Sequence, residues 1–159
     1  MSKRLSLKLK VGDPAPAFSA ITHAGARVSL ADFKGRPVVL YFYPKDDTPG
    51  CTREACAFRD THAAFEKRGA VVLGVSVDPV KSHERFAAKY ALPFPLLADE
   101  NRTIVQAYGV WGEKTFMGRK YQGTHRVTFL IGADGRIRQI WSTVKPETHA
   151  AEVLAALDA

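Results

Sequence analysis

Two long apolar runs and one amphipathic segment dominate the first half of the chain. Residues 38–43 and 70–77 are almost continuously hydrophobic, which indicates strands buried on both faces of a parallel sheet. Between them, residues 49–67 place small or apolar side chains at steps of three, four and seven, which predicts a helix with one buried face. Strand, helix and strand in this order predict a βαβ unit with a right-handed crossover. The predicted buried helical positions are Cys51, Ala55, Phe58 and Phe65.

Both ends of this helix carry residues that favour a boundary. Thr48 is a good N-cap, and Pro49 suits the first helical position because an N–H there would have no partner. Lys67 suits the last turn, where the helix dipole favours positive charge, and Gly69 suits the stop. The helix is therefore well defined at both ends by the sequence alone.

Shorter patterns predict the other elements and, with them, the fold class. Alternating strands and helices, followed by a hairpin and a closing helix, predict an α/β domain with three layers and a mixed central sheet. We expect a single domain over 1–159. The expected elements are a hairpin of 18–22 and 27–30, a helix from 79 to about 90, a strand at 95–98, a helix at 102–108, a long loop at 109–123, a hairpin of 127–131 and 136–142, and a final helix from near Pro146.

Composition and charge exclude several classes of protein. The chain is 46% hydrophobic and 25% charged, a balance typical of globular proteins rather than disordered ones. It has no apolar run of membrane-spanning length, and its basic start at 1–10 lacks the apolar core of a secretory leader, so we expect a cytoplasmic protein. The net charge of +7 would attract anionic partners non-specifically. No basic stripe interleaved with aromatic residues is present, so no specific nucleic-acid binding is expected.

Only two cysteines are present, Cys51 and Cys56, and they lie in one short segment. A cytosolic chain keeps few cysteines, usually for chemistry or as small buried hydrophobes. Two cysteines cannot form a four-ligand zinc site, and the five histidines show no ligand spacing with them. We therefore expect no metal site.

Cys51 lies where a buried strand passes into a helix, at the sheet edge where α/β proteins place their active sites. As the third helical residue, its sulfur faces unpaired backbone N–H groups and the positive end of the helix dipole, which favour the nucleophilic thiolate. Thr48 adds a hydroxyl able to hydrogen-bond the sulfur, and Gly50 lets the backbone approach a small ligand. The alternative is that Cys51 and Cys56 are inert helix residues, and it stays more open for Cys56.

The spacing of the two cysteines also has a mechanistic consequence. In an intact helix, residues five apart have Cα atoms about 8.6 Å apart. A disulfide needs less than about 7 Å, so Cys51 and Cys56 can bond only after the first turn unwinds. We therefore hypothesise a cycle between a helical dithiol and a locally unfolded disulfide.

The pattern Pro44-x-x-x-Thr48-x-x-Cys51 is similar to the active-site signature of the peroxiredoxins. The longer stretch 42–56 resembles the Q-type branch of that family, also called bacterioferritin-comigratory proteins. The resemblance implies a thioredoxin-like fold, reduction of hydrogen peroxide and alkyl hydroperoxides, and no need for a metal, flavin or haem. It extends over nearly the whole chain, with further matches at 11–18, 109–114, 116–118 and 126–131.

The resemblance implies a role for each cysteine. Cys51 matches the peroxidatic cysteine, and Cys56 matches the resolving cysteine that closes an intramolecular disulfide. That disulfide would be reduced by an external dithiol, in this family usually thioredoxin, although a glutaredoxin or another small thiol would also serve. An intramolecular partner removes the need for a second subunit, so a monomer is favoured.

Four other positions match residues that surround the peroxidatic cysteine in the family. The resemblance implies that Pro44 shields the thiolate from water and that Thr48 hydrogen-bonds the thiolate and the peroxide. It implies that Arg126 neutralises the thiolate and polarises the peroxide, and that Glu54 orients Arg126. Periodicity alone would make Arg126 only a charge before a strand.

Two other classes of function compete with a peroxidase. A dithiol–disulfide oxidoreductase acting on proteins typically uses Cys-x-x-Cys, whereas four residues separate Cys51 and Cys56 here. A non-enzymatic nucleic-acid or holdase module would depend on the net charge and not on Cys51. Peroxide-dependent turnover distinguishes the first rival, and salt-dependent binding unaffected by Cys51→Ala would support the second.

Overall fold

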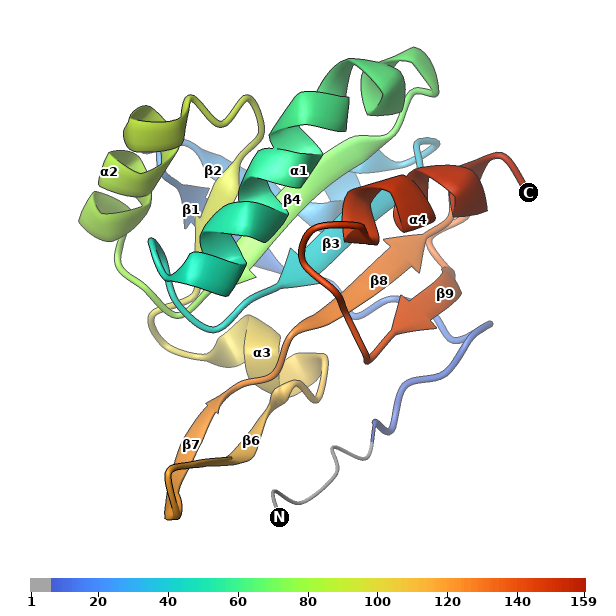
Figure 1. The fold of residues 1–159 in the computed structure, drawn as a ribbon. Coiled ribbons are helices and arrows are strands. Elements are labelled where there is room, and N and C mark those ends of the chain that lie inside the picture. The colour runs from blue at the N-terminus through green and yellow to red at the C-terminus, as the bar shows by residue number, and fades with distance from the viewer. Residues whose placement is uncertain (1–6) are drawn as a thin grey trace.

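A seven-stranded mixed sheet forms the centre of the molecule, as the computed structural model of residues 7–159 shows (Figure 1). The part of the basic start in residues 1–6 lies outside the described residues. The strand order is β2-β1-β5-β4-β3-β8-β9. At its middle, β3 (Val38–Phe42) pairs in parallel with β4 (Val71–Ser76) and antiparallel with β8 (Val127–Ile131). Every residue of these three strands is buried, as the continuous apolar runs predict.

The edges of the sheet are formed by the two predicted hairpins. On one side, β1 (Ser19–Thr22) pairs with β2 (Arg27–Ser29) and joins the sheet through an antiparallel contact with β5 (Leu96–Ala98). On the other side, β9 (Ile137–Trp141) pairs with β8. Both hairpin predictions are confirmed.

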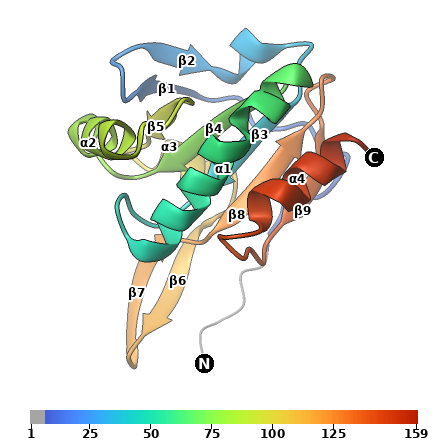
Figure 2. The ribbon, with the colours of Figure 1, turned by 45° about the horizontal axis from the view of Figure 1, so that its top comes forward.

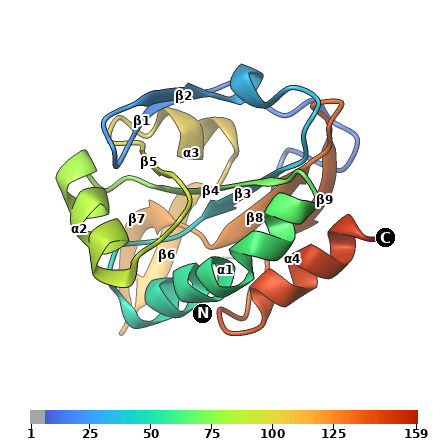
Figure 3. The same ribbon diagram turned by 90° about the horizontal axis from the view of Figure 1, so that it is seen from above.

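Helices cover both faces of the sheet and complete three layers (Figure 3). Alternate residues of β3 point to opposite faces, as a strand requires. Val39 and Tyr41 pack in one cluster with α1 (Pro49–Lys67), α2 (Val80–Tyr90) and α4 (His149–Leu157). Leu40 and the other alternate residues pack with α3 (Thr103–Ala107), and the short 3-10 helix η1 (Leu30–Phe33) lies against the same cluster. The thioredoxin-like three-layer α/β/α fold is therefore confirmed. Within residues 7–159, no helix is both long and apolar enough to cross a membrane.

The prediction of a long loop over 109–123 is wrong. The segment forms a two-stranded hairpin of β6 (Trp111–Phe116) and β7 (Arg119–Thr124), which projects from the body of the molecule (Figures 1 and 2). Its strands are mostly half-buried or exposed and carry many polar residues, so they lack the apolar pattern of a packed strand. The turn residues Met117 and Gly118 both have positive φ (50° and 81°), and methionine is not a residue that signals such a turn.

The last helix also begins later than predicted. Pro146 lies in a turn in which the N–H groups of Thr148 and His149 both donate to the carbonyl of Lys145. The helix follows from His149. Proline favours a helix start, but here it begins the preceding turn, a shift that local sequence does not distinguish.

Candidate active site

Cys51 lies at the third position of α1, at the carboxyl end of β3, and is 1% exposed. The helix begins at Pro49, and Thr48 occupies the N-cap position with extended backbone angles (φ −101°, ψ 156°). The Thr48 carbonyl accepts the N–H of Thr52 at 2.8 Å. The predicted helix start is therefore confirmed, and it places the sulfur near the positive end of the helix dipole.

Arg126 reaches the same point from the residue before β8. Its Nη2 donates to the Cys51 sulfur at 3.2 Å, and its Nη1 donates to Glu54 Oε1 at 2.6 Å. A guanidinium presents several donors in a fixed plane, so it can hold two acceptors at once. The structure therefore brings together Cys51, Arg126 and Glu54, three of the predicted site residues.

Glu54 is fully buried one turn after Cys51. Burial raises its pKa from 4.5 to about 7, although the charge and hydrogen bond of Arg126 act in the opposite direction. Burial lowers the pKa of Arg126, but Glu54 and Cys51 more than offset this and raise it overall. Within residues 7–159, the second carboxylate oxygen of Glu54 has no hydrogen-bond partner. The Arg126 guanidinium is thus held by the carboxylate of Glu54, which is itself shielded from water.

Gly50 lies beside the guanidinium of Arg126. A Cβ added at this position would lie 3.2 Å from Arg126 Nη2 and 3.8 Å from Pro146 Cγ. The absence of a side chain therefore leaves room for the guanidinium beside the sulfur. The close approach of a small ligand to the backbone at Gly50 stays a prediction.

Thr48 and Pro44 lie in the loop between β3 and α1. The Thr48 hydroxyl donates its proton to the carbonyl of Lys45 at 2.9 Å, so in this conformation the proton is not directed at the sulfur. Its lone pairs are the part left to accept a hydrogen bond. Pro44 is partly buried in the same loop.

Cys56 lies on α1 and is partly buried, and neither cysteine is in a disulfide. Figure 2 shows α1 as one continuous helix, which runs from Pro49 to Lys67. Cys51 and Cys56 are five residues apart in this helix and therefore lie on separate turns. Of the two conformations in the hypothesised cycle, this is the helical dithiol.

Lys114 on β6 is an additional cation near the site that sequence reasoning did not single out. Its Nζ donates to the carbonyl of Thr124, two residues before Arg126. Burial lowers the pKa of Lys114, the charge of Arg126 lowers it further, and Cys51 opposes both. The sequence predicts a long loop over this segment, and nothing in its pattern marks Lys114 as half-buried.

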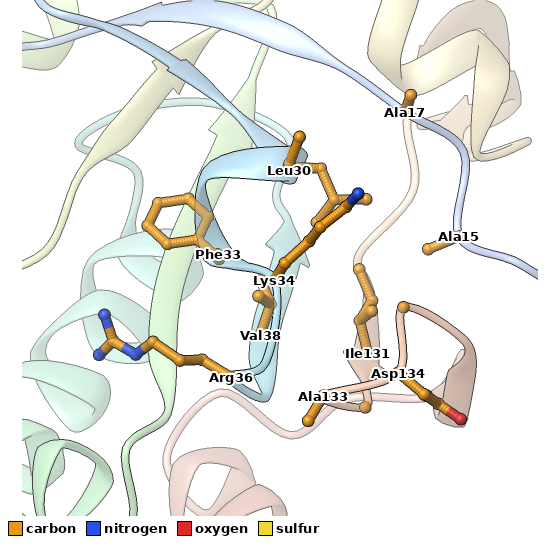
Figure 4. A pocket seen from close by; sticks show the side chains of 13 residues that line it. Ala15, Ala17, Leu30, Phe33, Lys34, Arg36, Val38, Ile131, Ala133 and Asp134 are labelled. Carbon is orange, nitrogen blue, oxygen red and sulfur yellow. The ribbon is translucent and has the colours of Figure 1, made fainter.

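A cavity of about 340 Å³ lies at the other end of the sheet and does not include this site. Figure 4 shows Leu30, Phe33 and Val38 on one side of it and Ile131 on the other. Val38 begins β3 and Ile131 ends β8, whereas the reactive cysteine follows the opposite end of β3. Lys34 and Asp134 bring polar groups to its lining. The cavity therefore lies apart from Cys51.

Comparison with known proteins agrees with this geometry. Residues 11–140 match the AhpC/TSA family. Peroxiredoxin Bcp of Escherichia coli K12 is 48% identical over 146 residues, which cover 92% of this chain and 94% of that protein. Peroxiredoxin Bcp of Bacillus subtilis 168 is 44% identical over 151 residues, covering 95% and 96%.

Solved structures agree in fold as well as in sequence. Peroxiredoxin Q of Xanthomonas campestris superposes with a TM-score of 0.86 at 40% identity, covering 96% of both chains. A cysteine-to-serine variant of PrxQ from Xylella fastidiosa gives a TM-score of 0.89 at 39% identity, covering 94% of this chain and 96% of that one. Since relatives match along almost the whole length in both sequence and fold, the chain belongs to the AhpC/TSA family and is a thiol peroxidase of the Bcp/peroxiredoxin Q type.

Proposed function

We propose that Cys51 is the peroxidatic cysteine and that Arg126, held by Glu54, activates it. The observation that carries this proposal is the 3.2 Å contact between Arg126 Nη2 and the Cys51 sulfur, backed by the 2.6 Å ion pair with Glu54. A guanidinium at this distance stabilises a thiolate, which is the nucleophilic form of cysteine.

In the first step, the Cys51 thiolate attacks one oxygen of a hydroperoxide. A sulfur–oxygen bond forms while the oxygen–oxygen bond breaks, and the leaving oxygen takes a proton from solvent and departs as water or an alcohol. Arg126 and the backbone N–H groups at the start of α1 stabilise the charge on the leaving oxygen. Thr48 accepts a hydrogen bond from the peroxide, and Pro44 limits the access of water. The product is a sulfenic acid at Cys51.

In the second step, Cys56 condenses with this sulfenic acid. A sulfur–sulfur bond forms and water leaves, so Cys51 and Cys56 end as an intramolecular disulfide. The first turn of α1 unwinds before this step, because the two positions are too far apart in an intact helix.

The disulfide is then reduced by exchange with an external dithiol, for which thioredoxin is the proposed donor. A reducing compartment such as the cytoplasm supplies dithiols of this kind and keeps both cysteines reduced between turnovers. The cycle closes within one chain, so a monomer suffices. Disulfide reduction by thioredoxin, compared with glutaredoxin at equal concentration, tests the choice of donor.

The direct test uses reduced protein, one equivalent of hydrogen peroxide, a free-thiol count and an intact mass. Loss of both thiols with a mass decrease of about two hydrogens is the expected result. The Cys56→Ser variant should instead gain one oxygen and stop at sulfenic acid, while Cys51→Ser should not react. Survival of both thiols in the wild-type protein would overturn the proposal and favour a dithiol–disulfide exchange role.

A further inference from the structure

The loop that joins β3 to α1 is attached along one side to α2. This loop, residues 43–48, carries Pro44 and Thr48 and leads directly into Cys51. Its exposed residue Asp47 accepts hydrogen bonds from Lys89 and Tyr90 near the end of α2. A second attachment is buried, and its chemistry is different.

Asp46 is the centre of the buried attachment. Its Oδ1 accepts the hydroxyl of Tyr43 at 2.6 Å, and its Oδ2 accepts the hydroxyl of Ser82 at 2.8 Å. Oδ2 also lies 2.6 Å from Nδ1 of His83. The side chains of Asp46 and His83 are 3% and 0% exposed. Both oxygens of the Asp46 carboxylate are therefore buried and have hydrogen-bond partners.

The partners of His83 fix the number of protons in this cluster. Its Nε2 lies 2.9 Å from the carbonyl oxygen of Leu97, which can only accept, so Nε2 carries a hydrogen. At Nδ1 there are then two possibilities: it donates a second hydrogen to Asp46, or it accepts one from a protonated Asp46. In both cases one proton lies between the two residues. Its loss would leave a buried carboxylate facing an imidazole lone pair.

The neighbouring titratable groups do not replace this proton. Burial, followed by the charge of Asp46, raises the pKa of Tyr43 well above its usual value, so the phenol remains a donor. Asp78, before α2, accepts the N–H of Asp46 at 2.9 Å and the hydroxyl of Ser76 at 2.6 Å, both on Oδ2. On the other side, burial and then His83 lower the pKa of His23.

Two further charges complete the surroundings of the cluster. Glu84, the next residue of α2, raises the pKa of His23 in part, and Lys89 pairs with Asp47 at the surface. Asp46, Asp78 and His83 also have ligand atoms within 4.8 Å of one another, but each side chain is already hydrogen-bonded. The 2.6 Å contact between Asp46 and His83 fits a shared proton.

We infer that Asp46 and His83 are positioning residues, whose shared buried proton attaches the active-site loop to α2 and so holds the start of α1 in its helical form. This inference rests on the proposed function, in which the helical form reacts with peroxide and the unwound form closes the disulfide. Loss of the proton weakens the attachment. Reaction with peroxide should then slow, and closure of the Cys51–Cys56 disulfide should accelerate.

The test compares the pH dependence of closure in the wild type and in Asp46→Asn. An asparagine can donate to neutral His83 and to Ser82 and accept from Tyr43, so the variant keeps the hydrogen bonds but has no proton to lose. We expect closure in the wild type to accelerate by about tenfold relative to Asp46→Asn as the pH is raised, since a hydrogen bond to a charged group is at stake. Thiol ionisation contributes equally to both proteins and cancels in the comparison. Asp46→Ala should close rapidly at every pH.

Asp47→Asn is the matched control, because it weakens the exposed attachment but leaves the shared proton in place; its pH profile should follow the wild type. Identical profiles for the wild type and Asp46→Asn would overturn the inference while leaving the peroxidase cycle intact. Absence of the disulfide in the wild type would instead contradict the proposed function. If Asp46→Asn does not fold, the imidazole nitrogen shifts of His83 in the wild type decide: the inference requires the bridging proton, and its loss must accompany the faster closure.

Discussion

At the scale of single residues, Arg126 serves two acidic partners with one guanidinium. The ion pair with Glu54 holds one nitrogen and leaves the other against the sulfur of Cys51. Gly50 also contributes to this arrangement, because a side chain at position 50 would push the Arg126 guanidinium out of its present position. The orientation of Arg126 therefore depends on a carboxylate behind it and on empty space beside it.

Gly50→Ala tests the empty space. The new methyl group would lie 3.2 Å from Arg126 Nη2 and displace it by a few tenths of an ångström. We expect the second-order rate with hydrogen peroxide to fall by about three- to tenfold, since full loss of an oxyanion donor costs more. Stability should not fall, because alanine favours a helix over glycine. Stopped-flow kinetics measures the rate.

The control for this variant is the same change in an Arg126→Lys background. If Gly50→Ala acts through the guanidinium, its effect should largely disappear there, as expected for coupled residues. An equal loss of rate in both backgrounds would show that Gly50 acts in another way.

Residues of the site differ in how far the sequence could predict them. The positions of Thr48 and Cys51 follow from rules for helix starts, which are local and readable. The contact of Arg126 with Cys51 joins residues 75 positions apart, so only the family resemblance suggested it. Glu54 lies three residues after Cys51 and therefore on the same helix face, a signal that was available. Its complete burial was not, because carboxylates are usually exposed.

At the scale of elements, α1 and the β6–β7 hairpin behave in opposite ways. The helix combines a cap, a proline, a stop and an apolar face, and these agree with one another, so its bounds are predictable. The hairpin has no such agreement, since its strands are polar and Met117 takes a left-handed conformation at its turn. Cross-strand pairing and the turn hold it, and neither is visible as periodicity.

The disulfide form should lose the start of α1 while keeping the rest of the fold. We expect backbone amides over 48–58 to exchange faster after oxidation, because closure requires the first turns to unwind. Hydrogen exchange with residue resolution measures this, with α4 as the internal reference. Equal protection of 48–58 in both redox states would contradict the hypothesised cycle.

Met117→Asn should stabilise the β6–β7 hairpin. Methionine has a φ of 50° at this position, and asparagine before glycine is the preferred pair for such a turn. We expect a gain of roughly 0.5–1 kcal/mol, seen as slower exchange of the hairpin amides. Gly118→Ala should have the opposite effect, because Gly118 has a φ of 81°. Slower exchange in both variants would contradict this account of the turn.

At the scale of the whole molecule, the continuous hydrophobic runs of the central strands made the fold class predictable. The three central strands are buried on both faces, so their positions and the three-layer class follow from sequence. The antiparallel attachment of β1 to β5 does not, because pairing between distant short strands leaves no local pattern. The free energy of unfolding likewise includes a pH-dependent contribution from a buried side chain, which the sequence pattern does not reveal.

That contribution comes from Glu54. Its pKa is about 7 in the folded protein against 4.5 when unperturbed, so the folded state binds the proton more tightly. The free energy of unfolding should therefore decrease as pH rises from about 4.5 to about 7 and level off above that range. At about 1.4 kcal/mol per pKa unit, the decrease attributable to Glu54 is about 3 kcal/mol.

Glu54→Gln provides the comparison, because it keeps an acceptor for Arg126 but has no proton to exchange. Urea denaturation of both proteins from pH 4.5 to 8 gives the difference, to which other carboxylates contribute equally. The stability of the variant relative to the wild type should increase with pH. A difference independent of pH would mean that Glu54 titrates in the same way in the folded and unfolded states.

Arg126 directly precedes Val127, which pairs with Phe42 at the end of β3. The cation is thus anchored to the rigid sheet, while the sulfur belongs to a helix start that unwinds in the proposed cycle. In each turnover the Cys51 sulfur would move away from the Arg126 guanidinium and later return to it. While the sulfur is away, small inorganic anions would bind the Arg126 guanidinium in its place. The anions in the buffer would therefore influence how quickly the start of α1 refolds after the disulfide is reduced.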